Sequence, residues 1–244
     1  MRIELLVCFK PVYNSVLVGS KTVPTSEAVD DYLKAILQLS GPAQNRVTSN
    51  ALAERLGIRA ASVTGMLQKL ASQRPALVIY EKHRGVRLSD AGKRRAWELV
   101  RHHRLLELFL HNVLKYSWDE VHEEAERLEH FISERFEDRV AALLGDPEVD
   151  PHGHVIPQKY GSASFPDSVS LLEWPLDQPA TIRSVGDRDS AMLRELQRLE
   201  LTPSVSLVVE QRNPNASVLV RITGRSQQIR LSNEVAGQVL VAPE

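Results

Sequence analysis

One segment near the middle of the chain, residues 119–130, constrains the fold most because both its polar and its apolar residues follow a helical period. An α-helix advances by about 100° per residue, so Glu126 and Glu129 lie within about 40° of His122 on the helix surface. His130 lies about 80° from His122 and joins the same face. A second, apolar stripe that would pack against a core consists of Val121, Ala125, Leu128 and Ile132. The segment therefore predicts a helix with four possible metal ligands beside a buried face.

The alternative to a metal site is an acidic face exposed to solvent, which is common on charged helices. Such faces normally mix both signs of charge and so form stabilising pairs four residues apart. Here one basic residue, Arg127, stands among Glu120, Glu123, Glu124, Glu126 and Glu129. A bound cation would relieve the repulsion between these carboxylates, and the helix therefore favours metal binding.

Size and composition limit the class of protein. A length of 244 residues is enough for two or three small domains. No apolar run approaches the roughly 18 residues that cross a bilayer, so we expect a cytoplasmic protein with no membrane partner. Residues 1–24 are too interrupted for a signal peptide, and we interpret them as an N-terminal extension. Cys8 is the one cysteine, which excludes a disulfide framework and a thiolate metal cluster.

Charge is distributed unevenly along the chain. Residues 43–104 contain 13 Lys and Arg against 4 Asp and Glu, a net charge of +9. Residues 105–150 contain 4 Lys and Arg against 13 Asp and Glu, a net charge of −9. A basic segment followed by an acidic one indicates a polyanion partner for the first and a cation for the second.

The basic segment has the pattern of a winged helix. A capped amphipathic helix runs from Thr25-Ser26 to Leu39, with Tyr32, Ala35, Ile36 and Leu39 as its apolar face. Residues 47–58 and 59–70 then predict two short helices joined by a turn at Gly57. Two short helices joined by a glycine turn also occur in helical corners that do not bind DNA. The following residues 77–88 alternate in polarity and turn at Arg84-Gly85, which predicts a hairpin and so distinguishes a winged helix from a simple corner.

In a winged helix the second short helix enters the major groove by its N-terminal end. The residues placed to contact DNA there are Arg59, Ala61, Ser62, Thr64, Gly65 and Lys69. On the hairpin, Lys82 and Arg84, with His83 and Arg87 beside them, would contact phosphates and contribute salt-dependent affinity. For these hairpin charges, the alternative is a solvated strand edge.

A long helix is predicted from Gly92 to about Leu114, and it carries His103 and Glu107 four residues apart, the spacing that lets one helix hold an ion. Taken alone, such a pair is more often a hydrogen-bonded surface pair. The apolar residues of this region exceed what one helical pair buries, which predicts a homodimer interface. They are Phe109, Leu110, Val121, Leu128, Phe131, Phe136 and Leu143.

Residues 150–157 predict a turn-rich boundary, and the segment that follows, as far as Asp167, predicts a linker. Because loop histidines beside Pro and Gly are usually structural, we assign His152 and His154 no ligand role. The remaining chain shows short strands and one helix, a pattern that suits a small SH3-like β-barrel. The strands are expected at 180–183, 205–209, 218–222 and 227–231, and the helix at 191–199. The predicted fold is mainly α with a small β part: a winged helix-turn-helix at 25–97, a helical dimerisation and metal-binding domain at 98–167 and the SH3-like domain at 168–244.

Five motifs together resemble the diphtheria-toxin-repressor family of metal-dependent transcriptional regulators, which includes the manganese transport regulators. They are Asp31-Tyr32-Leu33, residues 61–67, His103-Arg104-Leu105-Leu106-Glu107, residues 122–130 and Asp150-Pro151-His152-Gly153. The resemblance covers residues 25–160 with specific motifs and continues weakly through the third domain. It implies a homodimeric regulator, most simply a repressor of metal-uptake genes, that binds a double-stranded DNA operator.

The resemblance also implies two metal sites. The first would consist of Asp31, Glu126, Glu129 and His130. The second would consist of His103, Glu107, His122 and, from the third domain, Asp187, while another family ligand falls on Ser184, a poor ligand. Asp31 and Glu126 match manganese-type members, whereas Lys34 replaces an acid of that type and argues against a closely spaced manganese pair. Such oxygen-rich sets suit Mn²⁺ or Fe²⁺, and other divalent transition metals would also bind in vitro.

Two alternatives stay open beside a metal-activated regulator. One is a metal-independent winged-helix regulator whose acidic helix only dimerises. The other is a carboxylate-bridged metalloenzyme, because the Glu-x-x-Glu-His sequence at 126–130 resembles bundle ligands. Such an enzyme needs four ligand-bearing helices, and this chain supplies three. We therefore predict a regulator that is not an enzyme and takes no small organic substrate.

Overall fold

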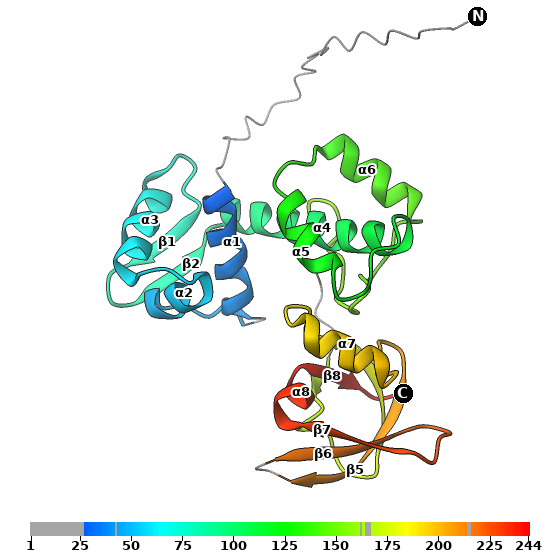
Figure 1. Cartoon of the computed structure of the whole chain (residues 1–244). Coiled ribbons are helices and arrows are strands. Elements are labelled where there is room, and N and C mark those ends of the chain that lie inside the picture. Colours follow the sequence, from blue (N-terminus) through cyan, green and yellow to red (C-terminus); the bar gives the residue numbers. More distant parts are fainter. Residues whose placement is uncertain (1–26, 42, 162, 164–166, 214–215) are drawn as a thin grey trace, which may run out of the picture.

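The computed structural model describes residues 27–41, 43–161, 163, 167–213 and 216–244. The N-terminal extension and the predicted cap at Thr25-Ser26 lie outside these residues. Figure 1 shows a helical winged module joined through one long helix to a second helical part, with a β-rich part beside the latter. In the described chain, no helix is long and apolar enough to span a membrane.

The winged module contains α1 (Glu27–Ser40), α2 (Ser49–Leu56), α3 (Ala60–Ser72), β1 (Val78–Glu81) and β2 (Gly85–Leu88). Gly57 ends α2 in the left-handed conformation, with φ 64°, and its N–H donates to the last carbonyls of the helix. The strands pair antiparallel, with Glu81 opposite Gly85. The predicted helix-turn-helix and hairpin are therefore confirmed.

The core of the winged module comes from one face of each helix. Leu33, Ile36, Leu52 and Leu67 are completely buried. The prediction that Leu39 belongs to the buried face of α1 is wrong, because 39% of it is exposed. The buried face is centred on Leu33, and at about 100° per residue Leu39 lies about 120° away from it.

A single helix, α4 (Asp90–Asn112), joins the winged module to the second helical part. Ser89 caps it by accepting a hydrogen bond from the N–H of Gly92 at 3.1 Å. Ala96 packs into the core of the winged module, whereas Leu105 and Leu106 pack against the following helices. The predicted boundary at residue 97 therefore falls inside a continuous helix whose packing partners change along its length.

The second helical part consists of the later turns of α4 with α5 (Val121–Leu128) and α6 (Glu134–Leu143). The predicted stripe is confirmed: Val121 and Ala125 are buried, and Leu128 and Ile132 pack partly against them. The helix is shorter than predicted, since α5 ends at Leu128 and residues 129–131 form a turn. The chain then enters α6, which Ser133 caps, its Oγ accepting a hydrogen bond from the N–H of Phe136.

The third part is a six-stranded antiparallel sheet in the order β3-β8-β4-β5-β6-β7 with two helices. Its elements are β3 (Val169–Ser170), β4 (Pro179–Val185), α7 (Ser190–Arg198), β5 (Ser206–Asn213), β6 (Ser217–Ile222), β7 (Gln228–Ser232), α8 (Asn233–Gly237) and β8 (Val239–Ala242). Leu171, Leu193, Leu207 and Val220 are completely buried in its core. Every strand and helix predicted for this region is present, with small shifts at the ends.

The third part rests on the loops that flank α5 and α6. Trp118 belongs to its hydrophobic core, and the Ser190 hydroxyl donates to the carbonyl of Asp119 at 3.1 Å. The N–H of Val185 donates to the carbonyl of His152 at 3.0 Å. These contacts hold the segment between β4 and α7 beside α5, and this segment contains Asp187.

Candidate metal centre

The four residues predicted for the first site gather where α1 meets α5 and the turn after it. Glu126 lies on α5, and Glu129 and His130 follow its end. His130 Nε2 lies 3.4 Å from Asp31 Oδ1 and 3.6 Å from Glu129 Oε1. The carboxylates of Asp30 and then Asp31 raise the pKa of His130 to about 10. Asp31, Glu129 and His130 are thus neighbours, whereas Glu126 has its ligand atom close to those of Glu129 and His103. Carboxylates with an imidazole are a donor set that fits a divalent cation.

The ammonium of Lys34 lies among these carboxylates. Its Nζ donates to Glu129 Oε2 at 2.7 Å, to Glu129 Oε1 at 2.9 Å and to Glu126 Oε1 at 2.9 Å. Lys34 is 6% exposed and the Glu129 side chain is fully buried. Burial disfavours the ammonium, but Glu129 and then Glu126 raise the pKa of Lys34. Lys34 departs from the manganese type, as the resemblance implied, but its place within the first site was not predicted.

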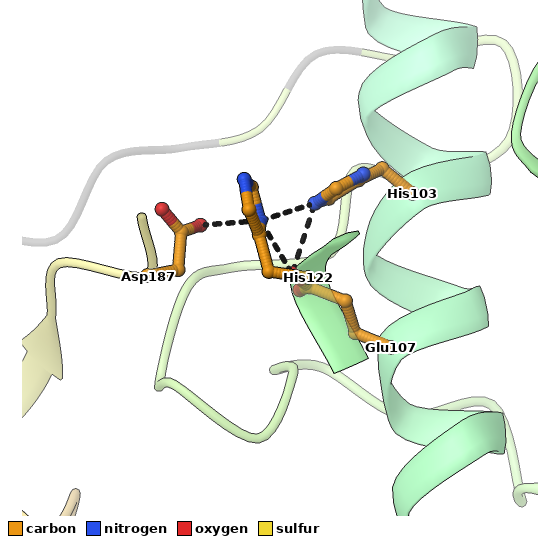
Figure 2. A group of neighbouring side chains, drawn as sticks. All are labelled: His103, Glu107, His122 and Asp187. Atoms are coloured by element: carbon orange, nitrogen blue, oxygen red, sulfur yellow. Dashed lines mark hydrogen bonds and ion pairs between the residues drawn. The ribbon is translucent and has the colours of Figure 1, made fainter. Parts of the chain in front are cut away.

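The second predicted site brings together side chains from α4, α5 and the third part of the chain. One ligand atom each of His103, Glu107, His122 and Asp187 lie within 4.8 Å of one another. Glu107 Oε1 lies 2.9 Å from His103 Nε2 and 3.1 Å from His122 Nδ1, and His122 Nδ1 lies 3.7 Å from Asp187 Oδ2. Figure 2 shows the four side chains pointing toward one another, with Asp187 approaching from outside the helices.

Glu107 is the most deeply buried member of this group, with 0% exposure. Burial opposes its charge, yet the His103 imidazolium holds the pKa of Glu107 well below its usual range. Burial likewise opposes the charged form of His103, but Glu107 raises the pKa of His103 to about 10. Glu107 Oε2 makes no hydrogen bond within the described residues. A divalent cation in this cluster would satisfy that atom and displace the histidine protons, so the donor set fits a metal.

Two further histidines lie at the edge of the second site. His152 Nδ1 is 3.7 Å from Glu107 Oε2, and His154 Nδ1 is 3.6 Å from Asp187 Oδ2. His154 Nδ1 also lies 3.3 Å from Asp150 Oδ2. These histidines were predicted to have no ligand role, although their His-Gly-His spacing was a signal for one. Ser184 is buried in β4 and is not part of this group of ligand atoms.

The predicted DNA-facing residues lie on the surface of the winged module. Arg59, Ala61, Ser62, Gly65 and Lys69 are exposed and Thr64 is half-buried. Lys82 and Arg84 are exposed in the turn between β1 and β2. Arg84 also pairs with Glu81 at 3.2 Å. The N-terminal part of α3 and the hairpin turn are therefore accessible to a partner.

Only part of the apolar set predicted for a subunit interface is exposed. Phe131 is 71% exposed, Leu143 65% and Phe136 41%. Leu110 and Val121 are completely or almost completely buried, so they belong to the helical core and not to an exposed apolar surface. They are enclosed because α4 packs against α5 along this stripe. The remaining apolar surface lies around the turn after α5 and on α6.

An accessible winged helix joined by one helix to clusters of metal-ligating side chains defines a metal-responsive DNA-binding regulator. Residues 24–86 match the DNA binding domain of iron dependent repressors, and residues 89–158 match their metal binding and dimerisation domain. Residues 169–243 match the FeoA domain. The chain belongs to the diphtheria-toxin-repressor family of metal-dependent transcriptional regulators, as the sequence motifs predicted.

Individual relatives agree with this assignment. The chain is 28% identical to the iron-dependent repressor IdeR of Mycobacterium leprae over 227 residues, 88% of this chain and 96% of the relative. It is 32% identical to the transcriptional regulator MntR of Lysinibacillus sphaericus over 129 residues, 53% of this chain and 89% of the relative. A manganese-dependent transcriptional repressor in complex with manganese is 36% identical, with a TM-score of 0.81, covering 88% of this chain and 100% of that one. The family consists of repressors, so the metalloenzyme alternative is set aside.

Proposed function

We propose that this protein is a cytoplasmic, homodimeric repressor of metal-uptake genes that binds its operator when Mn²⁺ or Fe²⁺ occupies the two clusters. The observation that carries the proposal is that the first cluster joins two parts of the chain. Asp31 lies on α1 of the winged module, whereas Glu126 lies on α5 of the second helical part. A cation held by both would restrict how the winged modules of a dimer are oriented.

The first site would use Asp31, Glu126, Glu129 and His130, and the second His103, Glu107, His122 and Asp187. The relatives include an iron-dependent repressor and a manganese-dependent one, which supports these two ions. A bound metal would neutralise the buried carboxylates and take the place of protons on the histidines. Because Asp187 belongs to the third part of the chain, ligation there also ties that part to α5.

Operator recognition is assigned to α3 and the hairpin turn. The base-facing positions would be Arg59, Ala61, Ser62, Thr64 and Gly65, with phosphate contacts from Lys69, Lys82 and Arg84. Metal strengthens DNA binding only if it binds the DNA-competent arrangement more tightly than the other arrangements. Dimerisation would use the apolar surface formed by Phe131, Phe136 and Leu143, which a second subunit would cover.

The test is operator binding with and without Mn²⁺, measured by fluorescence anisotropy on a DNA fragment selected for binding by the protein itself. Wild type should bind more tightly with Mn²⁺, and Glu126→Ala should lose that gain. Glu123→Ala is the matched control, because Glu123 is an exposed glutamate of the same helix. Equal operator affinity for wild type and Glu126→Ala in both conditions would contradict the proposal.

A further inference from the structure

Lys34 is a charged side chain in a place where an unpaired charge is strongly unfavourable. It is 6% exposed, and its neighbours Leu33 and Ala35 on α1 are buried as well. A buried ammonium persists only when opposite charges and hydrogen bonds replace its hydration. Glu129 supplies two such contacts and Glu126 a third, all at 2.9 Å or less. The side chain is therefore held by the carboxylates that we assign to the first metal site.

The Lys34 ammonium lies within a group of possible metal ligands that shares Glu126 and Glu129 with the first site. One ligand atom each of His103, Glu126 and Glu129 lie within 4.8 Å of one another. Lys34 Nζ lies 3.2 Å from His103 Nδ1 in addition to its contacts with the two glutamates. A divalent transition ion approaches carboxylate oxygens to about 2.0–2.2 Å, so it and the ammonium cannot share these oxygens.

We propose that Lys34 is an internal competitor for the first metal site, whose ammonium occupies Glu126 and Glu129 until a divalent cation displaces it. The inference rests on the proposed function, because it takes the first cluster to be a metal site. Each binding event then includes the loss of a buried ion pair. Lys34 thereby lowers the affinity of the site and raises the metal concentration at which the regulator responds. It also keeps α1 attached to the end of α5 before metal arrives.

A cavity beside Lys34 makes such an exchange possible. Its volume is about 400 Å³, and its lining includes Asp31, Lys34, Gln38, Arg55, Glu126 and Arg188. The Glu126 side chain is 35% exposed, so an ion entering this cavity reaches a ligand directly. The same space accommodates the flexible lysine side chain after it leaves the carboxylates. Arg188 donates to Gln38 at 3.2 Å, so the third part of the chain helps to form the cavity wall.

The experiment removes the charge of Lys34 and measures Mn²⁺ binding by calorimetry on the full chain. All the proteins compared carry Glu107→Gln, the common background, which weakens Mn²⁺ binding at the second site. The titration then measures Mn²⁺ binding at the first site. Adding Lys34→Met, which keeps a long unbranched side chain, should tighten Mn²⁺ binding by at least about tenfold. The matched control is Lys34→Arg, which retains a cation and should give no such gain.

Thermal stability provides an independent readout. In chelator, Lys34→Met should lower Tm, because two buried carboxylates lose their counter-ion, and Mn²⁺ should then raise Tm more than it does in the background protein. Lys34→Gln, which is polar and shorter, should change both quantities in the same direction if Lys34→Met folds poorly.

The outcomes separate the inference from the function on which it rests. Equal Mn²⁺ affinities with and without the Lys34 charge, while the first site still binds metal, would overturn the competition alone. Absence of first-site Mn²⁺ binding in the background, in Lys34→Met and in Lys34→Gln would overturn the proposed first site together with the competition. Tighter binding in Lys34→Met but not in Lys34→Arg would support the inference.

Discussion

Replacing Asp187 by asparagine tests whether the third part of the chain contributes to the metal centre. Asp187 Oδ2 lies 3.7 Å from His122 Nδ1 and 3.6 Å from His154 Nδ1, and its side chain is 21% exposed. Burial opposes the charge, but His154 and then His122 lower the pKa of Asp187. Asparagine keeps the shape and removes the charge that a bound cation would use.

The size of the effect follows from this partial burial. Interactions with a charged partner contribute about 1.5–3 kcal/mol, and the partial exposure of Asp187 places it at the lower end. A loss of about 1.5 kcal/mol corresponds to about a tenfold weaker Mn²⁺ affinity at the second site. Calorimetry of Asp187→Asn in a Glu126→Ala background, which disables the first site, would measure it.

The control for this experiment is Asp177→Asn, because Asp177 is an exposed aspartate of the same part of the chain. It makes the same change in net charge and should leave Mn²⁺ affinity unchanged. If Asp187→Asn and Asp177→Asn both bind Mn²⁺ as tightly as the background protein, Asp187 is not a ligand and the reasoning from geometry is refuted.

Two more perturbations test how the surroundings support the centre. Gly153 has φ 87°, and a Cβ there would lie 2.0 Å from the carbonyl oxygen of Arg183. Gly153→Ala should therefore displace the loop that carries His152 and His154. Calorimetry should then show weaker Mn²⁺ binding at the second site. The control is Gly145→Ala, because Gly145 also has a positive φ, 76°, but a Cβ there would have no atom within 4 Å. An equal loss of Mn²⁺ affinity in both variants would contradict the idea that the close packing of Gly153 against Arg183 supports the site. Burial, and then a hydrogen bond to Glu134, raises the pKa of Glu98 to about 7 from its ordinary 4.5. Between these two pH values the folded protein retains a proton on Glu98 that the unfolded chain releases. The contribution of protonated Glu98 to folding stability is therefore fully present below about pH 4.5 and is lost as pH rises through about 7. In chelator, the free energy of unfolding of Glu98→Gln should equal that of wild type near pH 4.5. At pH 8 it should exceed that of wild type by only about 1 kcal/mol, because the Glu98 side chain is 30% exposed. Thermal melts that show the same pH dependence for both proteins would contradict the raised pKa.

Local patterns in the sequence predicted most of the secondary structure correctly. Leu67 and Leu70 follow Val63 at helical spacing, and all three are completely buried in α3. Gly57 ends α2 because its backbone adopts a positive φ that other residues rarely adopt. Such features depend on neighbours a few residues away, and the sequence displays those neighbours directly.

The ends of elements are less predictable from local patterns. The polar face at 122–130 predicts one continuous helix, yet α5 ends at Leu128 and His130 follows in the turn. His130 nevertheless reaches Asp31, because the turn directs it toward α1. The proximity of His130 to Asp31 therefore depends on a backbone turn that the helical spacing did not predict.

The helices and strands, the winged-helix pattern and the separation of a basic from an acidic segment are predictable from the chain, because each follows from the spacing and composition of residues. The position of the Lys34 ammonium between Glu126 and Glu129, and the approach of His152 to Glu107, come from the packing of distant segments. Coulomb energy depends on distance in space and on burial, and residue order shows neither. Residues 34, 126 and 129 become neighbours only when α1 packs beside the end of α5.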